Sequence, residues 1–376
     1  MTKFAVCQPN LGRLFSLQVL RAVAALMVAM CHLYAIDQRF FGGPAMPSLA
    51  NLGMAGVDLF FVLSGFVMVL LARVGAGHPA VVPAFLLARA ARIYPLWWLA
   101  LGAISLVWLV QPTWVFSSIA APPNLLADFI LWPHARQPLL AVGWTLIHEM
   151  YYYLAFGLLL LFPMGHLVRG LMVWMFLVAL GNVWISSLGV TMSPVLTLVT
   201  HPLTLEFGLG ATVGLLAARG VRPAPFILLW LGLIWMLAAC LLTHDPAVTL
   251  FENDWLRVAA FGPAWALIVL GMVGLETDRG IVLGSPLIEL GDASYALYLV
   301  HVPVLVALAR LIAPFCGPNV WDNILAWALS LTATVTTALL VRRYVECPIL
   351  ARLTRLRRKL LPRGSAMMES PSSPRS

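Results

Sequence analysis

The chain has 376 residues, of which 61% are apolar and only 10% carry a charge, whereas about a quarter of the residues of an ordinary soluble domain are charged. This composition excludes a water-soluble globular protein. Ten membrane spans of roughly 20 residues each would use about 200 residues. The mean hydropathy of +0.93 leaves little room for a second, soluble domain. The composition therefore indicates an all-α, multi-pass protein of the lipid bilayer.

The formal net charge of +8 would suggest a nucleic-acid partner in a soluble protein, but in a membrane protein the basic residues belong first to the loops. We therefore expect no nucleic-acid partner. The five cysteines show no CxxC pair and no metal-ligand spacing, so they predict neither a disulfide framework nor a metal site. No phosphate-binding loop, dinucleotide fingerprint or HExxH motif is present. The first apolar run has no small-residue cleavage site after it, which favours an uncleaved helix over a signal peptide.

Apolar segments bounded by proline, glycine and charge predict ten transmembrane helices. These helices are expected at residues 16–36, 55–73, 95–111, 139–162, 169–188, 200–218, 225–243, 256–275, 293–313 and 323–345. An even number places both termini on one side of the membrane. With cytoplasmic termini, eighteen Lys and Arg residues fall on the inner side, against four on the outer side or at outer helix ends. The positive-inside rule therefore predicts cytoplasmic termini.

The same pattern divides the chain into three parts. Residues 1–15 are a cytoplasmic segment, residues 16–350 are the membrane domain, and residues 351–376 are a cytoplasmic tail. The tail begins with a basic stretch around residues 352–359, which we expect on the anionic inner leaflet. Its last part, from about Pro362, is rich in Ser and Pro and is expected to be disordered.

Ionisable side chains at bilayer depth cost several kcal/mol unless they are paired or face a cavity, so each one is a functional hypothesis. Arg21 and His32 lie eleven residues apart on the first predicted helix, which corresponds to three turns and about 16 Å. Both side chains therefore point to one face. Either they form an interior seam or each extends to its nearer interface. Asp58 begins the second helix at the level of His32, where it would orient the imidazole or only cap its own helix.

Small and basic residues suggest two further contact points. Ser64 and Gly65 let a second backbone or a ligand approach closely, and packing is the commoner use of such residues in membrane helices. Arg89 and Arg92 are three residues apart and share a face at the expected cytoplasmic start of the third helix. Their planar guanidiniums suit phosphate oxygens. A plain positive-inside anchor is the alternative.

The remaining buried ionisable residues are ambiguous. Glu149 lies beside His148 among the aromatic residues that follow Trp144, near mid-membrane. It could serve chemistry or be a structural partner of Arg21 or His301. His301 follows Tyr295 on the ninth helix, and a core histidine bonded to a tyrosine hydroxyl is its alternative role. Glu206 has the same ambiguity, and we assign it no function.

Six of these segments, in this order, resemble the membrane acyltransferase 3 family, which O-acylates bacterial cell-surface carbohydrates and some small molecules. The likeness covers about residues 17–350. The segments are Arg21 with ten residues before His32, GVDLFFVLSGF at 56–66, RAARIYP at 89–95, WTLIHEMYYY at 144–153, LGDASYALYLVH at 290–301 and ECP at 346–348. The sequence around residues 143–146 and 290–295 most resembles that of the exopolysaccharide acetyltransferases. That subgroup has Asn-Tyr where this chain has Ile147 and His148, at a position expected to help shape the acceptor pocket.

The resemblance implies an O-acyltransferase of the bacterial inner (plasma) membrane that uses acyl-CoA, and first of all acetyl-CoA, as co-substrate with no permanently bound cofactor. Arg89 and Arg92 would meet the coenzyme A phosphates at the cytoplasmic face, with Arg21 within reach. His32 would be the general base that deprotonates a sugar hydroxyl, a role typically worth 10² to 10⁴ in rate. The acceptor would be an exopolysaccharide or its lipid-linked precursor, and polysaccharide assembly machinery is an expected partner.

Arg21, Asp58 and Glu149 complete the expected catalytic group with His32. Ser64, Gly65, Trp144, His148, Tyr295 and His301 are expected in the pocket or in its supporting structure. Because the donor is cytosolic and His32 lies near the outer end, two routes stay open. Either the pantetheine arm reaches deep into the bundle, or the acyl group is first handed to a relay such as His301 or Glu149. A secondary transporter and a noncatalytic scaffold are the alternative functions; the matched, broken half-repeats typical of many transporters are not found.

Overall fold

The computed structural model describes residues 14–41, 48–72, 76–79, 81–115, 122–189, 191–243, 245–280, 284–316 and 320–360. In residues 247, 320 and 356–360 only the backbone is described. The regular structure of these segments is helical, without a strand, and the expected all-α class is confirmed. The elements are α1 (Phe15–Phe40), η1 (Ser48–Met54), α2 (Ala55–Ala72), α3 (Val81–Val110), η2 (Pro112–Trp114), α4 (Leu125–Ile130), α5 (Gly143–Leu159), α6 (Met164–Ser187), α7 (Pro194–Val199), α8 (Thr204–Ala218), α9 (Pro225–Leu242), α10 (Pro246–Glu252), α11 (Asp254–Arg279), α12 (Ser285–Asp292), α13 (Ser294–Ile312), η3 (Ala313–Phe315), α14 (Val320–Val341), η4 (Arg342–Glu346) and α15 (Cys347–Leu360).

Eight helices in the described part of the chain are long and apolar enough to cross a membrane, so the protein is a multi-pass membrane protein. The two other predicted spans correspond to α5 and α8, which have 17 and 15 residues. At 1.5 Å per residue these two helices are about 25 and 22 Å long, somewhat less than the roughly 30 Å hydrocarbon core. Each of the ten expected helices therefore has a counterpart, but two are short.

The third helix begins much earlier than the sequence pattern predicts. The expected start was residue 95, whereas α3 runs from Val81 and contains Pro95 in its interior. A proline removes one backbone hydrogen bond, which membrane helices tolerate where neighbouring groups compensate. Arg89 and Arg92 consequently lie within a continuous helix and not in the turn before one.

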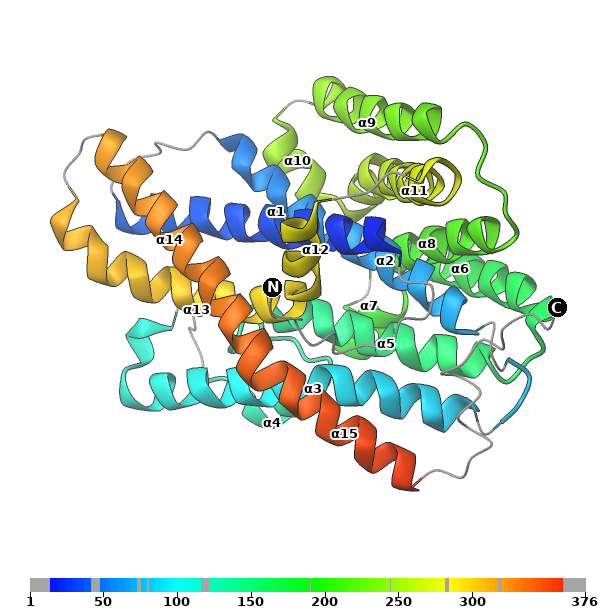
Figure 1. Ribbon diagram of the computed structural model, residues 1–376, viewed down its shortest axis with the longest axis horizontal. Coiled ribbons are helices and arrows are strands. Elements are labelled where there is room, and N and C mark those ends of the chain that lie inside the picture. Colours follow the sequence, from blue (N-terminus) through cyan, green and yellow to red (C-terminus); the bar gives the residue numbers. More distant parts are fainter. Residues whose placement is uncertain are drawn as a thin grey trace.

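The last helix is also longer than expected. It continues from α14 through a π-helical turn, η4, into α15, and Figure 1 shows α14 and α15 as one diagonal rod in orange and red. Residues 351–360, which we assigned to the tail, are therefore helical. The expectations for residues 1–13 and for the Ser- and Pro-rich residues after Leu360 lie outside the described residues.

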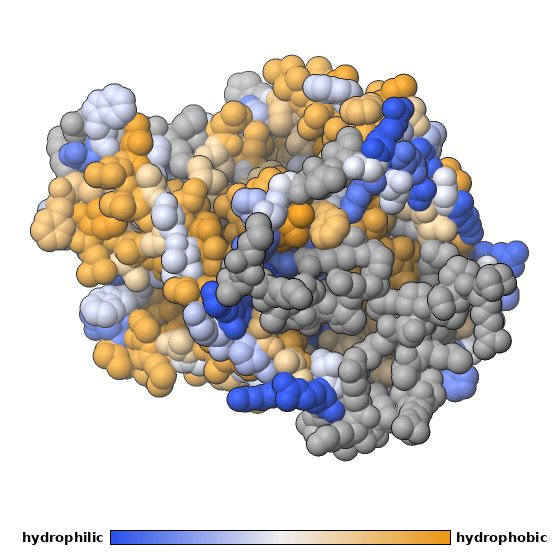
Figure 2. Space-filling view, in the orientation of Figure 1, coloured by the Kyte–Doolittle hydropathy of each residue, from blue (hydrophilic) through white to orange (hydrophobic). Residues whose placement is uncertain are grey.

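The helices form a core and a lipid-facing periphery. The most apolar windows of α11, α2 and α1 are 78%, 67% and 56% buried, whereas those of α6 and α9 are each 11% buried. The peripheral helices expose large apolar side chains such as Phe176, Trp184 and Trp230. Figure 2 shows broad hydrophobic areas on this face of the molecule, with hydrophilic residues gathered mainly toward its right-hand and lower edges. Such an apolar exterior is stable only in lipid.

Helices α2 and α8 pack so closely that their backbones are in contact. A Cβ atom placed on Gly65 would lie 2.0 Å from the Phe207 carbonyl oxygen, and one on Gly210 would lie 1.9 Å from the Val62 carbonyl oxygen. Helices in membranes pack closely where small residues meet. Gly65 therefore serves the contact between α2 and α8, and its neighbour Ser64 is left facing α5.

We predict that Gly65→Ala lowers the thermal stability of the purified protein, because the added methyl group collides with backbone atoms of α8 that cannot move independently. Overpacking of this kind costs about 1–3 kcal/mol or more. Gly102→Ala is the matched control, since nothing lies within 4 Å of a Cβ atom at that position. Thermal unfolding in detergent should separate the two variants, and equal midpoints would contradict the packing role.

Candidate active site

The imidazole of His32 is held by two acceptors. Its Nδ1 lies 2.9 Å from the Val28 carbonyl oxygen and 3.3 Å from Nε2 of His301. A carbonyl oxygen only accepts, so the hydrogen-bond network assigns the proton of His32 to Nδ1. Nε2 of His32 then carries a lone pair, and it has no hydrogen-bond partner among the described residues. The residue is half-buried, and Nε2 is not among the fully buried unpartnered atoms, so this nitrogen can accept a proton from a bound hydroxyl.

His301 is fixed in the same way from the neighbouring helix. Its Nδ1 lies 3.1 Å from the Leu297 carbonyl oxygen, which leaves Nε2 to accept from His32. The two rings meet edge to face, with centroids 4.9 Å apart and planes at 72°. His301 is only 1% exposed. The His32 ring therefore faces α13 inside the bundle, and the imidazole pair joins α1 to α13.

Two tyrosines hold α13 in this position. The Tyr295 hydroxyl donates to the Ile93 carbonyl oxygen of α3 at 2.6 Å. One turn further along, the Tyr298 hydroxyl lies 2.6 Å from the Thr145 hydroxyl of α5. Both bonds are buried. They tie the helix that carries His301 to α3 and α5.

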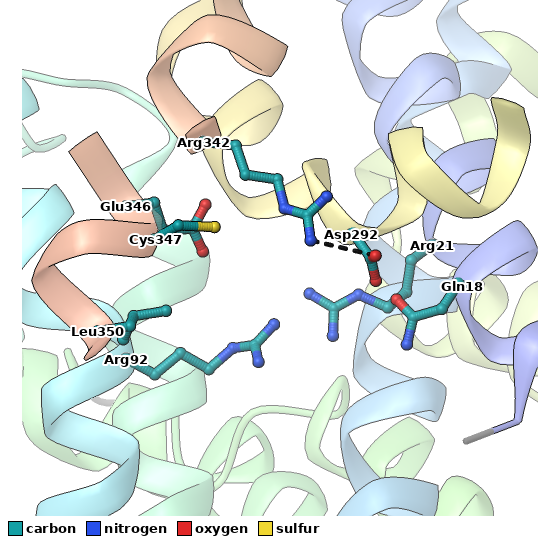
Figure 3. Close-up of a pocket in the computed structure, with 8 residues that line it drawn as sticks. All are labelled: Gln18, Arg21, Arg92, Asp292, Arg342, Glu346, Cys347 and Leu350. Atoms are coloured by element: carbon teal, nitrogen blue, oxygen red, sulfur yellow. Dashed lines mark ion pairs between the residues drawn. The ribbon is translucent and has the colours of Figure 1, made fainter. Parts of the chain in front are cut away.

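About three turns before His32 on α1, Arg21 donates from Nε to the Ser294 hydroxyl at 3.1 Å. It lines a small pocket that is partly open to solvent. In this pocket Arg342 pairs with Asp292 at 3.1 Å. Figure 3 shows its lining residues, which are Gln18, Arg21, Arg92, Asp292, Arg342, Glu346, Cys347 and Leu350.

The arginine pair of α3 divides between two environments. Arg92 points into the pocket, whereas the Arg89 guanidinium lies over the rings of Phe85 and Tyr153, 5.9 Å from each centroid. Residues three apart on a helix differ by about 60° in direction, which is enough to separate the two guanidiniums. Both are expected at the coenzyme A phosphates, but of these two residues only Arg92 lines the pocket.

Glu149 of α5 contacts the second helix and a tyrosine of its own helix. Its Oε1 accepts from the Ser64 hydroxyl at 3.4 Å and from the Tyr153 hydroxyl. Its charge acts on the guanidiniums of Arg21 and Arg89. Glu149 is therefore placed with the arginines and offsets part of their positive charge.

The structure corrects the role expected for Asp58. Its carboxylate is bound at both oxygens by Arg257 of α11, at 2.8 and 2.9 Å. Asp58 is 0% exposed and Arg257 is 5% exposed. A buried fork of two charge-assisted bonds satisfies the carboxylate, so Asp58 joins α2 to α11 and is not the group that holds His32. That position is occupied by His301.

Further titratable groups surround this ion pair. Glu206 is fully buried, and neither of its oxygens has a hydrogen-bond partner among the described residues. The Arg257 guanidinium lies 5.9 Å from the Trp144 ring centroid. His148 donates from Nδ1 to the Trp144 carbonyl oxygen at 3.0 Å. Its Nε2 is buried and has no hydrogen-bond partner among the described residues.

His148 also meets a second histidine. Its ring lies edge to face against His201, with centroids 4.8 Å apart, and His201 pairs with Asp254 at 3.4 Å. The described residues contain no group of three or more His, Cys, Asp or Glu side chains that could hold a metal ion. The aromatic rings of Trp144 and Phe61 border the His148 ring.

Several of these residues carry no functional signal in the sequence. Arg257 is expected only as a basic residue at an outer helix end, and Arg342 only as an inner anchor. Their partners are Asp58, 199 residues from Arg257, and Asp292, about 50 residues from Arg342, so no local spacing could show them. His201 stands between two short elements and also carried no local signal.

Comparison with known proteins identifies the class. The acyltransferase domain of the acyltransferase 3 family matches residues 14–343. The chain therefore belongs to this family and is an O-acyltransferase, which sets aside the transporter and scaffold alternatives.

Two curated proteins are similar over most of their length. The exopolysaccharide production protein ExoZ of Rhizobium meliloti (strain 1021) is 30% identical over 272 residues, covering 69% of this chain and 79% of that protein. The acyltransferase MdmB of Streptomyces mycarofaciens is 28% identical over 386 residues, covering 93% of this chain and 95% of that protein. No solved structure matches the chain.

We predict that Asp58→Asn strongly destabilises the fold, because the substitution leaves the buried Arg257 charge without its counterion. Removing one member of a buried pair costs about 3–5 kcal/mol. Asp278→Asn is the matched control, since Asp278 pairs with Arg222 at a partly exposed site and exposed pairs contribute little. Thermal unfolding in detergent would measure both variants. A midpoint for Asp58→Asn equal to that of the control would show that the pair is not a stabilising contact.

Proposed function

We propose that this enzyme transfers an acyl group, first of all acetyl, from acyl-CoA to a hydroxyl of an exopolysaccharide or its lipid-linked precursor, at the bacterial inner membrane. His32 acts as general base. The observation that carries this proposal is the hydrogen-bonded state of His32, in which Nδ1 donates and Nε2 is left as a partly accessible lone pair. A base of this kind must lie within hydrogen-bond reach of the hydroxyl proton.

In the proposed step, Nε2 of His32 takes the hydroxyl proton while the acceptor oxygen attacks the thioester carbonyl. The oxygen–carbon bond forms, the carbon–sulfur bond breaks, and the coenzyme A thiolate leaves. The imidazolium then returns its proton to that thiolate, so the reaction consumes no net proton. During the step the positive imidazolium keeps its Nδ1–H against two acceptors, the Val28 carbonyl oxygen and Nε2 of His301. This arrangement stabilises the charge at the moment it forms.

The donor side of the proposal rests on the pocket at the start of α1. Arg21 and Arg92 point into it and suit phosphate oxygens. The same helix carries Arg21 and His32 eleven residues apart, or about 16 Å. An extended pantetheine arm would therefore run along α1 from the phosphates to the thioester. We propose this direct route, since it needs no covalent intermediate on the protein.

The acceptor side rests on the relatives and on the aromatic residues around His148. The exopolysaccharide production protein among the relatives supports a polysaccharide-type acceptor. Trp144 and Phe61 border the ring of His148, and apolar aromatic faces together with a few polar groups are usual in ligand sites. We propose that this region, together with the polysaccharide assembly machinery, presents the acceptor to His32.

We predict that His32→Ala lowers acetyl transfer at least a hundredfold, the lower limit for a positioned base, without loss of folded protein. Proteoliposomes with labelled acetyl-CoA and NMR of O-acetyl groups on the host polysaccharide would measure the loss. His166→Ala is the control, because His166 is an exposed residue at the start of α6. Transfer at the normal rate by His32→Ala would refute the proposed mechanism.

We predict that His301 acts as a positioning residue through His32. Its replacement removes one charge-assisted hydrogen bond, worth about 1.5–3 kcal/mol, so His301→Ala should lower kcat by roughly ten- to a hundredfold. The KM for acetyl-CoA should not change. His301→Gln offers an amide oxygen to the His32 Nδ1–H and should restore part of kcat. Loss of folded protein in both variants, or equal activity of the two, would indicate a packing role only.

A further inference from the structure

Three guanidiniums converge on the pocket at the start of α1, the end of this helix that is expected to be cytoplasmic. Arg21 comes from α1, Arg92 from α3 and Arg342 from the π-helical turn η4. Figure 3 shows all three side chains pointing toward the centre of the pocket. Only the first two belong to the donor site proposed above, and Arg342 has no role in it.

The carboxylates near the pocket do not balance these charges. Three arginines and two acids, Asp292 and Glu346, line the pocket. With the neighbouring Arg89 and Glu149 the count is four arginines and three acids. Glu346 is 7% exposed, and its Oε2 has no hydrogen-bond partner among the described residues. Like charges held together in a partly buried space repel one another, and desolvation increases the cost. The arrangement is therefore incomplete without an anion.

The ion pair between Arg342 and Asp292 is suited to exchange. Its side chains are 17% and 18% exposed, whereas those of the Arg257 and Asp58 pair are 6% and 0% exposed. A partly hydrated pair contributes much less than a buried one. Asp292 is also the last residue of α12, where a negative charge is disfavoured by the helix dipole. An incoming phosphate can therefore compete with this carboxylate for Arg342.

The backbone of η4 supports the same interpretation. The rod of α14 and α15 is regular except for the turn Arg342–Glu346, which is π-helical. Such turns are rare and occur frequently at functional sites. Here the turn begins and ends with the two residues that it contributes to the pocket, Arg342 and Glu346.

We infer that Arg342 is a third phosphate-binding residue of the donor pocket and that Asp292 is its resident counterion, displaced when the phosphates of the donor enter. This inference rests on the proposed function. Three convergent guanidiniums fit a ligand with several phosphate groups, such as coenzyme A with its diphosphate and its 3′-phosphate. An anionic lipid headgroup presents the same chemistry and is separated from it by the experiment.

The inference predicts opposite effects at the two members of one ion pair. Arg342→Gln removes a phosphate ligand and should raise the Kd for coenzyme A about tenfold, as expected for one charge-assisted bond. Asp292→Asn removes the competing counterion while keeping the shape of the side chain, and it should lower the Kd severalfold. A merely structural link between α12 and η4 would make both variants less stable and would not strengthen binding in either.

The test is coenzyme A binding by calorimetry to the full-length protein in phosphatidylcholine nanodiscs, with pantetheine as the probe that lacks all phosphates. Arg222→Gln is the control, because its ion pair with Asp278 lies outside the pocket. The proposed function is tested separately: the wild type should bind coenzyme A, and Arg92→Ala should lose that binding. If that holds while Asp292→Asn fails to tighten binding, the inference about Arg342 and Asp292 is overturned. Should Arg342→Gln not fold, Asp292→Asn still decides it.

A second arm identifies the source of the phosphate. The same measurements in phosphatidylglycerol nanodiscs should leave the Kd of the wild type for coenzyme A unchanged if the pocket takes the soluble donor. A rise in that Kd which disappears in Arg342→Gln would show that a lipid headgroup occupies the third guanidinium instead, and it would overturn the assignment to the donor.

Discussion

The site depends on one repeated hydrogen bond, from a histidine Nδ1 to the backbone carbonyl one helical turn earlier. His32, His148 and His301 each make it, at 2.9, 3.0 and 3.1 Å. A helix interior offers few other partners, because its amides are already bonded within the helix. The bond selects the tautomer and directs Nε2 away from the helix axis. Each ring thus presents a lone pair to neighbouring helices, and only that of His32 is left both unpartnered and partly accessible.

The features that the sequence could predict are those that depend on a single helix. Helical periodicity placed Arg21 and His32 on one face, and the structure directs both toward α13, through Ser294 and His301. The features that it could not predict depend on two helices. Asp58 has a nearby histidine in the sequence pattern, but the bidentate geometry of Arg257 satisfies its carboxylate more completely. The predicted start of the third helix is wrong for a related reason. Pro95 ends a helix only where no neighbouring group compensates for the lost backbone hydrogen bond.

The charged residues of the bundle form two separate levels. Arginines and Glu346 line the pocket where α1 begins, and His32 lies about 16 Å further along that helix. The level with guanidiniums suits a polyanion, and the level with imidazoles suits a hydroxyl and its proton. A donor with phosphates at one end and a reactive thioester at the other, as proposed above, would match this polarity of α1.

The shortness of α5 and α8 has a consequence for access from outside the cell. These helices have 17 and 15 residues, so the hydrocarbon barrier that they can bridge is thinner than the one crossed by α3 or α11, with 30 and 26 residues. Lipid adapts to short spans by local thinning. Where the bilayer thins at α5 and α8, a polar group on one side of the membrane has less hydrocarbon to cross before it reaches the interior of the bundle.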